Sequence, residues 1–343
     1  MTRQALIDRI SPLWLGIGIS GSLVLILLIV ETALGRWGAF LVEGELDVFA
    51  KVSEGELRDF RLAFVHCLVI GYLPAAFVHV LQRSRQTVLS LQDVLNCTQQ
   101  ECEALAASVR LSRSGLIIFG LCGLLLAFAG PYLVPPVPDT PWSPSSWSPE
   151  VFWHRIGGPV ANVWTWWLGY AVISVSLRMS RIATRLQRID LLDLSPLLPF
   201  TQLGLTNALL MVGSLSIWSL MLVETGFGMM LLIAGAATLI STTLALWLPV
   251  RGVHERICQS KQEELRDLNR EISSRRSSLM SPNASTNGGE MADLVTYRSL
   301  VDSVSEWPFT SSTYTRVFLY ALMPVAAWGI GVIAEEVVAR VFF

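Results

Sequence analysis

Histidine and cysteine are the residues of this sequence that could ligate a metal or act as catalytic nucleophiles. The chain has five cysteines and four histidines, which are His66, His79, His154 and His254. Two of the histidines fall toward each side of the membrane that the apolar segments imply, so the four cannot form one site. A proton or metal shared by His66 and Glu335 is an alternative, but no third ligand is evident near them. We therefore expect no metal site, no cofactor and, from the odd number of cysteines, no disulfide framework.

A row of four arginines follows the apolar segment 160–177. Its members are spaced by three, four and three residues and share one helix face: Arg178, Arg181, Arg185 and Arg188. This spacing superficially resembles that of a voltage-sensing helix, but a sensing charge must cross the membrane field. Because these arginines come after a complete apolar segment, the sequence predicts that they lie at the membrane surface and contact lipid phosphates.

Motifs of common enzymes are absent from the sequence or stand in the wrong context. Gly16, Gly18 and Gly21 match the dinucleotide-binding spacing G-x-G-x-x-G, but they lie in an apolar segment without the preceding strand that such a site needs. Gly16 and Ser20, four residues apart, are instead expected to allow close helix packing. No G-x-S-x-G, H-E-x-x-H or Walker A pattern occurs. We expect no catalytic residue, and a membrane enzyme is the third possibility.

The composition indicates an integral membrane protein. Of the 343 residues, 52% are hydrophobic and only 15% are charged, and the mean hydropathy is +0.52. The formal net charge of −2 gives no reason to expect nucleic acid as a partner. A membrane-spanning helix needs about 20 apolar residues. We predict an all-α polytopic bundle, a single membrane domain over 1–343 with seven spans near 13–32, 62–81, 115–135, 160–177, 204–223, 227–250 and 317–334.

The distribution of basic residues predicts the orientation of the chain. The N-terminal segment and the second, fourth and sixth connections hold two, four, four and nine of the 25 Lys and Arg residues, 19 in all. The connections on the other side and the C-terminal tail hold the remaining 6. Since cytoplasmic loops retain positive charge, we predict a cytoplasmic N-terminus and a C-terminus outside. The lipid bilayer is therefore an expected partner.

Helical segments predicted on the cytoplasmic side cover 82–114 and 251–316. Thr98 followed by Glu101 has the spacing of a capping box, which restarts a helix after a break near Asn96. Beyond the sixth span, apolar residues recur at the spacing of a coiled-coil seam: Leu265, Leu268, Ile272 and Leu279. We expect the cytoplasmic segments to form a small bundle of four helices, with this seam as the candidate site for a protein partner, cytoplasmic or membrane-bound.

The middle of every predicted span lacks Asp, Glu, Lys and Arg. Ion-coupled carriers and proton relays often place such groups there, so coupled transport is disfavoured. The favoured hypothesis is a signalling, scaffold or accessory protein whose cytoplasmic helices bind a partner. The alternative is a channel or transporter for an unidentified solute. No particular oligomeric state follows from the sequence.

Three short segments carry a resemblance to a known group of proteins. They are Asp190-Leu191-Leu192-Asp193-Leu194-Ser195-Pro196, Leu248-Pro249-Val250-Arg251 and Trp307-Pro308-Phe309. These segments resemble a group of prokaryotic multi-pass membrane proteins with no assigned activity. The resemblance implies a cytoplasmic (inner) membrane location and a shared layout, in which an elbow at 189–200 accompanies cytoplasmic helices. It supplies no catalytic residue.

Overall fold

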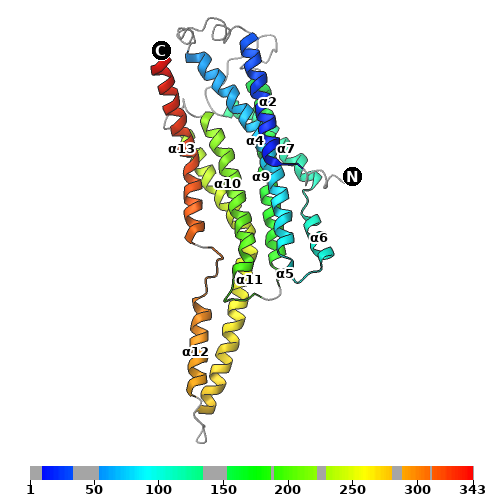
Figure 1. Cartoon of the computed structure of the whole chain (residues 1–343), viewed down its shortest axis with the longest axis vertical. Helices are drawn as coiled ribbons and strands as arrows, with labels where there is room; N and C mark the ends of the chain where they lie inside the picture. Colours follow the sequence, from blue (N-terminus) through cyan, green and yellow to red (C-terminus); the bar gives the residue numbers. More distant parts are fainter. Residues whose placement is uncertain are drawn as a thin grey trace.

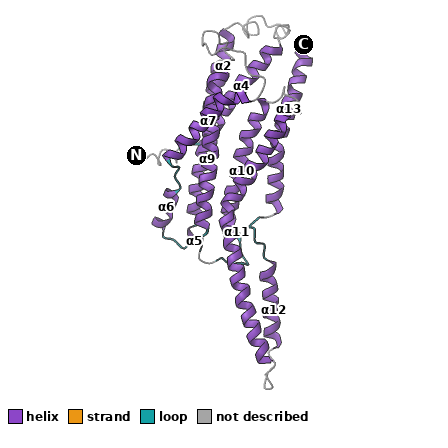
Figure 2. Ribbon diagram, turned by 180° about the vertical axis from the view of Figure 1, so that it is seen from behind, coloured by secondary structure: helices purple, strands orange, loops and turns teal. Residues whose placement is uncertain are grey.

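The computed structural model describes residues 10–33, 54–133, 153–186, 189–221, 229–279, 288–309 and 311–342. Within these ranges every regular element is a helix (Figure 2). The α-helices are α2 (Pro12–Ala33), α4 (Glu54–Ser90), α5 (Gln92–Leu95), α6 (Gln99–Ser108), α7 (Arg113–Leu133), α9 (Gly158–Ala183), α10 (Leu198–Ser219), α11 (Met229–Leu279), α12 (Gly288–Ser303) and α13 (Ser311–Phe342). A π-helical turn, η3 (Trp153–Gly157), precedes α9, and a 3-10 turn, η4 (Ser195–Leu197), precedes α10.

Seven of the described helices are long and apolar enough to cross a membrane. They are α2, α4, α7, α9, α10, α11 and α13, and each overlaps one of the seven ranges predicted from the sequence. The prediction of an all-α bundle with seven apolar helices is confirmed at this level. α4 begins at Glu54, well before its apolar stretch.

Four helices form the centre of the bundle (Figure 1). α4 packs against α9 and α10, and α11 packs against the other side of both α9 and α10. The other three apolar helices lie at the periphery, α2 on α4, α7 on α9 and α13 on α10. The core that the central helices enclose is apolar and contains, among others, Leu73, Leu168, Met179, Phe200 and Leu203.

Small residues allow the helices to approach closely. Gly71 of α4 faces Gly16 and Ser20 of α2, and a Cβ on Gly71 would meet the Ser20 side chain and lie 2.9 Å from the Gly16 carbonyl oxygen. The packing role predicted for Gly16 and Ser20 is therefore confirmed. Gly252 of α11 approaches the backbone of Ser180 on α9 in the same way. Such contacts are typical of helix packing in membranes, where small residues let backbones meet.

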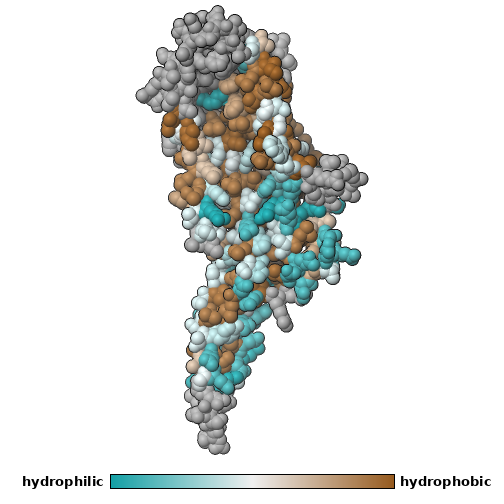
Figure 3. Space-filling view, viewed as in Figure 1, coloured by the Kyte–Doolittle hydropathy of each residue, from teal (hydrophilic) through white to brown (hydrophobic). Residues whose placement is uncertain are grey.

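The peripheral helices expose large apolar side chains. On each of α2, α7 and α13 these include residues more than 60% exposed, such as Trp14, Leu125 and Ile330. Figure 3 shows a broad hydrophobic surface around the upper part of the molecule. An apolar surface of this extent needs a partner other than water, and lipid matches its composition and the length of the helices.

The connection between α4 and α7 contains the predicted helix break. Asn96 adopts the left-handed conformation with a φ of 50°, and the Thr98 and Glu101 side chains and backbone nitrogens form the capping box that starts α6. The helix restart predicted there is confirmed. The sequence predicted no disulfide framework, but one disulfide is present, between Cys97 just before α6 and Cys102 within it. The left-handed Asn96 reverses the chain so that the two cysteines meet.

α11 continues as one helix far beyond its apolar part. After Val250 it becomes rich in charge, and together with α12 it forms a helical hairpin that projects from the bundle (Figures 1 and 2). We call this hairpin, residues 251–279 and 288–303, the arm. α6 packs on α4 and α12 packs on α11, as two separate pairs. The expectation of a single four-helix cytoplasmic bundle is therefore wrong, because each amphipathic helix buries its apolar face on the long helix nearest to it.

Candidate functional site

The two helices of the arm are joined by an apolar seam. Leu268 of α11 is 8% exposed, and Leu265 packs beside it. The facing side chains on α12 are Leu294, Tyr297 and Val301, of which Val301 is fully buried. The candidate interaction seam predicted at Leu265 and Leu268 thus packs within the arm itself. Of its other members, Ile272 is half-buried, and the side chain of Leu279 lies outside the described residues.

Polar contacts brace the arm along its whole length. Arg275 forms an ion pair with Glu290 of α12, and Arg298 donates to the Asn269 side chain at 2.8 Å. The Tyr297 hydroxyl donates to Glu264 at 3.2 Å. Exposed ion pairs of this kind contribute little individually, about 0–1 kcal/mol each. Their spacing along both helices nevertheless fixes the register of α12 on α11.

The middle of the outer face of α12, turned away from α11, carries no charge, and the exposed Asp293 and Asp302 stand at its two edges. We define it by six exposed residues, Ala292, Val295, Thr296, Ser299, Leu300 and Ser303. Val295 is 50% exposed and Leu300 is 49% exposed. The hydroxyls of Thr296 and Ser303 donate to backbone carbonyls of their own helix, at 2.8 Å and 2.7 Å, and so need no water to satisfy them.

The exposed side of α11 is very different. It carries both acidic and basic residues, among them Glu255, Glu263, Arg266, Asp267, Arg270 and Arg276. In Figure 3 the projecting hairpin is mostly hydrophilic on the side of α11 and more hydrophobic on the side of α12. The exposed side of α11 is therefore more charged than the outer face of α12.

The base of the arm is fixed to the bundle. Arg256 donates from Nε to the Leu186 carbonyl at the end of α9, at 2.7 Å. The Thr201 hydroxyl of α10 donates to the Pro308 carbonyl, at 3.0 Å, in the segment that leads from α12 to α13. The first bond joins α11 to the residues that follow α9, and the second joins the segment after α12 to α10, at the point where the arm leaves the bundle.

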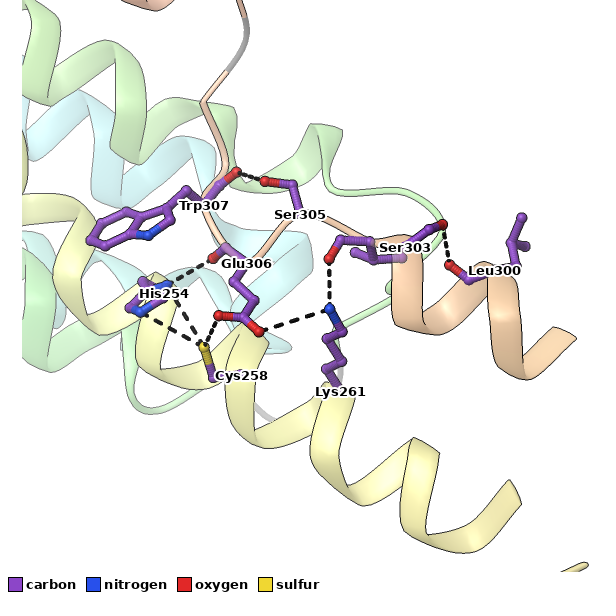
Figure 4. A network of polar contacts seen from close by, with 9 residues as sticks. His254, Cys258, Lys261, Leu300, Ser303, Ser305, Glu306 and Trp307 are labelled. Atoms are coloured by element: carbon purple, nitrogen blue, oxygen red, sulfur yellow. Dashed lines mark hydrogen bonds and ion pairs between the residues drawn. The ribbon is translucent and has the colours of Figure 1, made fainter. Parts of the chain in front are cut away.

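A cluster of possible metal ligands lies at this base (Figure 4). His254 and Cys258 are four residues apart on α11 and face Glu306, which follows α12. The Cys258 sulfur lies 3.7 Å from either ring nitrogen of His254 and 3.4 Å from Oε2 of Glu306. One ligand atom from each of the three residues can be chosen so that all lie within 4.8 Å of one another. We call these three residues the Cys–His–Glu cluster.

The imidazole of His254 is held on two sides. Its Nδ1 lies 2.9 Å from the backbone carbonyl oxygen of Glu306, and since a carbonyl only accepts, Nδ1 carries the proton. In the neutral form of the ring, Nε2 then carries the lone pair. The ring stacks on Trp307, with centroids 3.9 Å apart and an angle of 7° between the planes. Ring orientation and tautomer are thus both fixed by residues next to Glu306.

The surroundings of Cys258 do not favour a nucleophilic thiolate. Burial raises the pKa of the Cys258 thiol, and the hydrogen bond to the Glu306 carboxylate raises it further. A reactive cysteine needs the opposite shift. Lys261 lies on the other side of the carboxylate, with its ammonium 3.8 Å from Oε1 of Glu306 and 2.9 Å from the Val304 carbonyl oxygen. Cysteine-based catalysis is therefore not what this geometry supports.

The four arginines of the predicted row do not share one environment in the structure. Arg178 donates to the Ser108 carbonyl at the end of α6 and so ties α9 to α6. Arg181 and Arg185 are exposed, at the end of α9 and just beyond it. Arg188 lies outside the described residues. Contact with lipid phosphates stays a prediction, and Arg181 and Arg185 are the side chains placed to make it.

The elbow predicted at 189–200 is irregular, as its prolines require, and it lines an open groove of about 860 Å3. The Asp190 side chain accepts from the Leu192 nitrogen and the Asp193 side chain from the Ser195 nitrogen, at 2.9 Å and 3.0 Å. Asp93 of α5 lines the groove from the other side. Both elbow carboxylates serve to shape the turn before α10.

No protein-family model, curated protein or solved structure matches the chain. The site must therefore be interpreted from its own geometry. The sequence did not predict the Cys–His–Glu cluster, because the only histidine paired with a carboxylate was His66, with Glu335, and none was paired with a cysteine. The available signal was the spacing of His254 and Cys258, which puts both on one helix face. Glu306 lies 48 residues from Cys258, and no local pattern indicates that the two meet.

Proposed function

We propose that this chain is an integral protein of a prokaryotic cytoplasmic membrane, and that it presents the arm in the cytoplasm as a binding site for another protein. Seven apolar helices and the lipid-like surface of α2, α7 and α13 support membrane insertion. The excess of Lys and Arg on the side of the arm supports a cytoplasmic arm, with the N-terminus on the same side and the C-terminus outside. The protein would then act as a scaffold, signalling or accessory component.

The uncharged middle of the outer face of α12 is the observation that carries this proposal. A helix in water normally carries charged residues on its exposed face. On α12 the exposed Asp293 and Asp302 stand only at the edges of the outer face, which also exposes Val295 and Leu300 and is uncharged in its middle. Covering the exposed halves of these two side chains would contribute about 1 kcal/mol each. A stiff, braced arm also loses little conformational freedom on binding, which favours association.

The shape of the face indicates a helical partner. Ala292, Thr296, Ser299 and Ser303 recur at intervals of four, three and four, and form a shallow strip of small side chains. Val295 and Leu300 stand on either side of this strip. A partner helix with apolar side chains can lie along the strip, close to the α12 backbone, between these two ridges.

The proposal is tested by the composition of the particle extracted from native membranes in mild detergent. Ser299→Arg places a charge in the middle of the outer face of α12, and arginine is a good helix former, so the arm stays folded. Gln262→Arg is the matched control, because Gln262 is equally exposed but lies on α11. Burying an unpaired charge costs several kcal/mol.

The wild-type particle is expected to contain a second protein in fixed stoichiometry, which Ser299→Arg removes and Gln262→Arg retains. A particle that contains this chain alone, at any number of copies, would contradict a partner protein. Loss of the second protein in both variants would show that binding depends on the charge of the arm rather than on the outer face of α12.

A further inference from the structure

We propose that the Cys–His–Glu cluster is a binding site for a thiophilic divalent metal ion, with Zn2+ as the best match. This inference rests on the base of the arm and does not depend on whether α12 binds a partner. The three ligands come from two segments, α11 and the connection between α12 and α13. A bound ion would therefore clamp the connection onto α11 where the arm leaves the bundle.

The spacing of the ligand atoms agrees with tetrahedral zinc. Bonds of about 2.3 Å to sulfur and about 2.0–2.1 Å to nitrogen put those two ligand atoms about 3.6 Å apart across a tetrahedron. The Cys258 sulfur and the His254 nitrogen are 3.7 Å apart, and the sulfur and Oε2 of Glu306 are 3.4 Å apart. The remaining separation, between His254 and Glu306, closes by rotation of the Glu306 side chain, which is 49% exposed.

The outer contacts match those of a metal ligand. A ligating histidine usually donates its second ring N–H to a carbonyl or carboxylate, which fixes the tautomer and aims the other nitrogen at the ion. The Nδ1 proton of His254 is directed to the Glu306 carbonyl, which leaves Nε2 for the metal. The Glu306 carboxylate is divided in the same way, with Oε2 toward Cys258 and Oε1 toward Lys261. It would bind the ion through one oxygen.

The chemistry of the ligands selects among metals. Thiolate and imidazole favour zinc and similar transition metals, whereas Mg2+ and Ca2+ need more oxygen ligands than the cluster offers. When the ion binds, the Cys258 sulfur forms a bond to it and releases its proton to solvent. Three protein ligands leave a fourth tetrahedral position for a water molecule.

Cobalt is the probe that tests this site, because a bond between Co2+ and a thiolate absorbs light in a characteristic way. The full-length protein in detergent is stripped with a chelator, titrated with Co2+ and then back-titrated with Zn2+. We expect one equivalent of Co2+ to give a thiolate band that Zn2+ abolishes. Cys258→Ser should remove the band, and His254→Ala and Glu306→Gln should each weaken binding by more than about tenfold, since even outer contacts of a site cost roughly 10–100-fold.

Two controls test whether a change in Co2+ binding comes from the loss of a ligand. Cys122→Ser removes a free cysteine on α7, away from the cluster, and should leave the band unchanged. Glu306→Gln alters an exposed side chain, and its elution volume and helix content should equal those of the wild type, so weakened binding reflects the lost ligand. The proposal is overturned if the wild type gives no thiolate band, if the band survives Cys258→Ser, or if it disappears only when Cys97 and Cys102 are replaced.

Discussion

Replacing Gly252 by alanine should separate α11 from α9. A Cβ at this position would meet the Ser180 carbonyl oxygen and lie 2.8 Å from the carbonyl carbon. The obstacle is backbone, so no side-chain rotation relieves it and the helices themselves must move. Overpacking of this kind costs about 1–3 kcal/mol. Alanine also stabilises a helix by about 1 kcal/mol relative to glycine. This gain offsets part of the loss of stability that the clash causes.

Gly235→Ala on the same helix removes this ambiguity. A Cβ on Gly235 meets nothing within 4 Å, so this variant gains the helix propensity without the clash. The free energy of unfolding, measured by denaturation in mixed micelles, should then be about 1–3 kcal/mol lower for Gly252→Ala than for Gly235→Ala. Equal stabilities of the two variants would refute the close contact between α9 and α11, and with it the position of the base of the arm.

Two further predictions concern the loops next to the arm. Thr98→Ala removes the capping box of α6 and should cost about 0.5–2 kcal/mol, seen as faster hydrogen exchange in residues 99–108. Gln100→Ala on the same helix should not change the exchange rate, and equal rates in the two variants would contradict the role of the cap. Hydrogen bonds from Ser195 lower the pKa of Asp193, so this carboxylate stabilises the elbow above its unfolded pKa and loses that effect as the pH falls through its folded pKa. Ser195→Ala should raise the pKa of Asp193 measured by NMR, and an unchanged value would show that the side-chain hydrogen bond has no effect.

Local patterns predicted much of this fold. The seven apolar helices follow from length and hydropathy alone, because each needs only its own sequence to satisfy its backbone hydrogen bonds. The Thr98–Glu101 capping box and the helical character of the residues after Val250 are likewise local features, and the structure confirms both. Gly16 and Ser20 were also predictable, since two small residues on one helix face nearly always mark a close contact.

The features that could not be predicted from the sequence depend on how the chain folds back on itself. A heptad-like seam predicts that Leu265 and Leu268 are buried, but not which helix covers them. The structure covers them with α12, so the surface left for a partner is the outer face of α12 rather than the seam. The Cys–His–Glu cluster depends on the same folding back of α12, which brings Glu306 to His254. The bond between Cys97 and Cys102 depends on the left-handed turn at Asn96, which a count of cysteines does not reveal.

Photocrosslinking in native membranes tests the central claim most directly. A photoreactive side chain is placed at Val295, on the outer face of α12, and separately at Gln262, on the charged side of α11. If the arm binds a protein through α12, Val295 should yield one discrete protein adduct, Gln262 should yield none, and Ser299→Arg should abolish the adduct. No adduct from Val295, or the same adduct from both positions, would contradict this account.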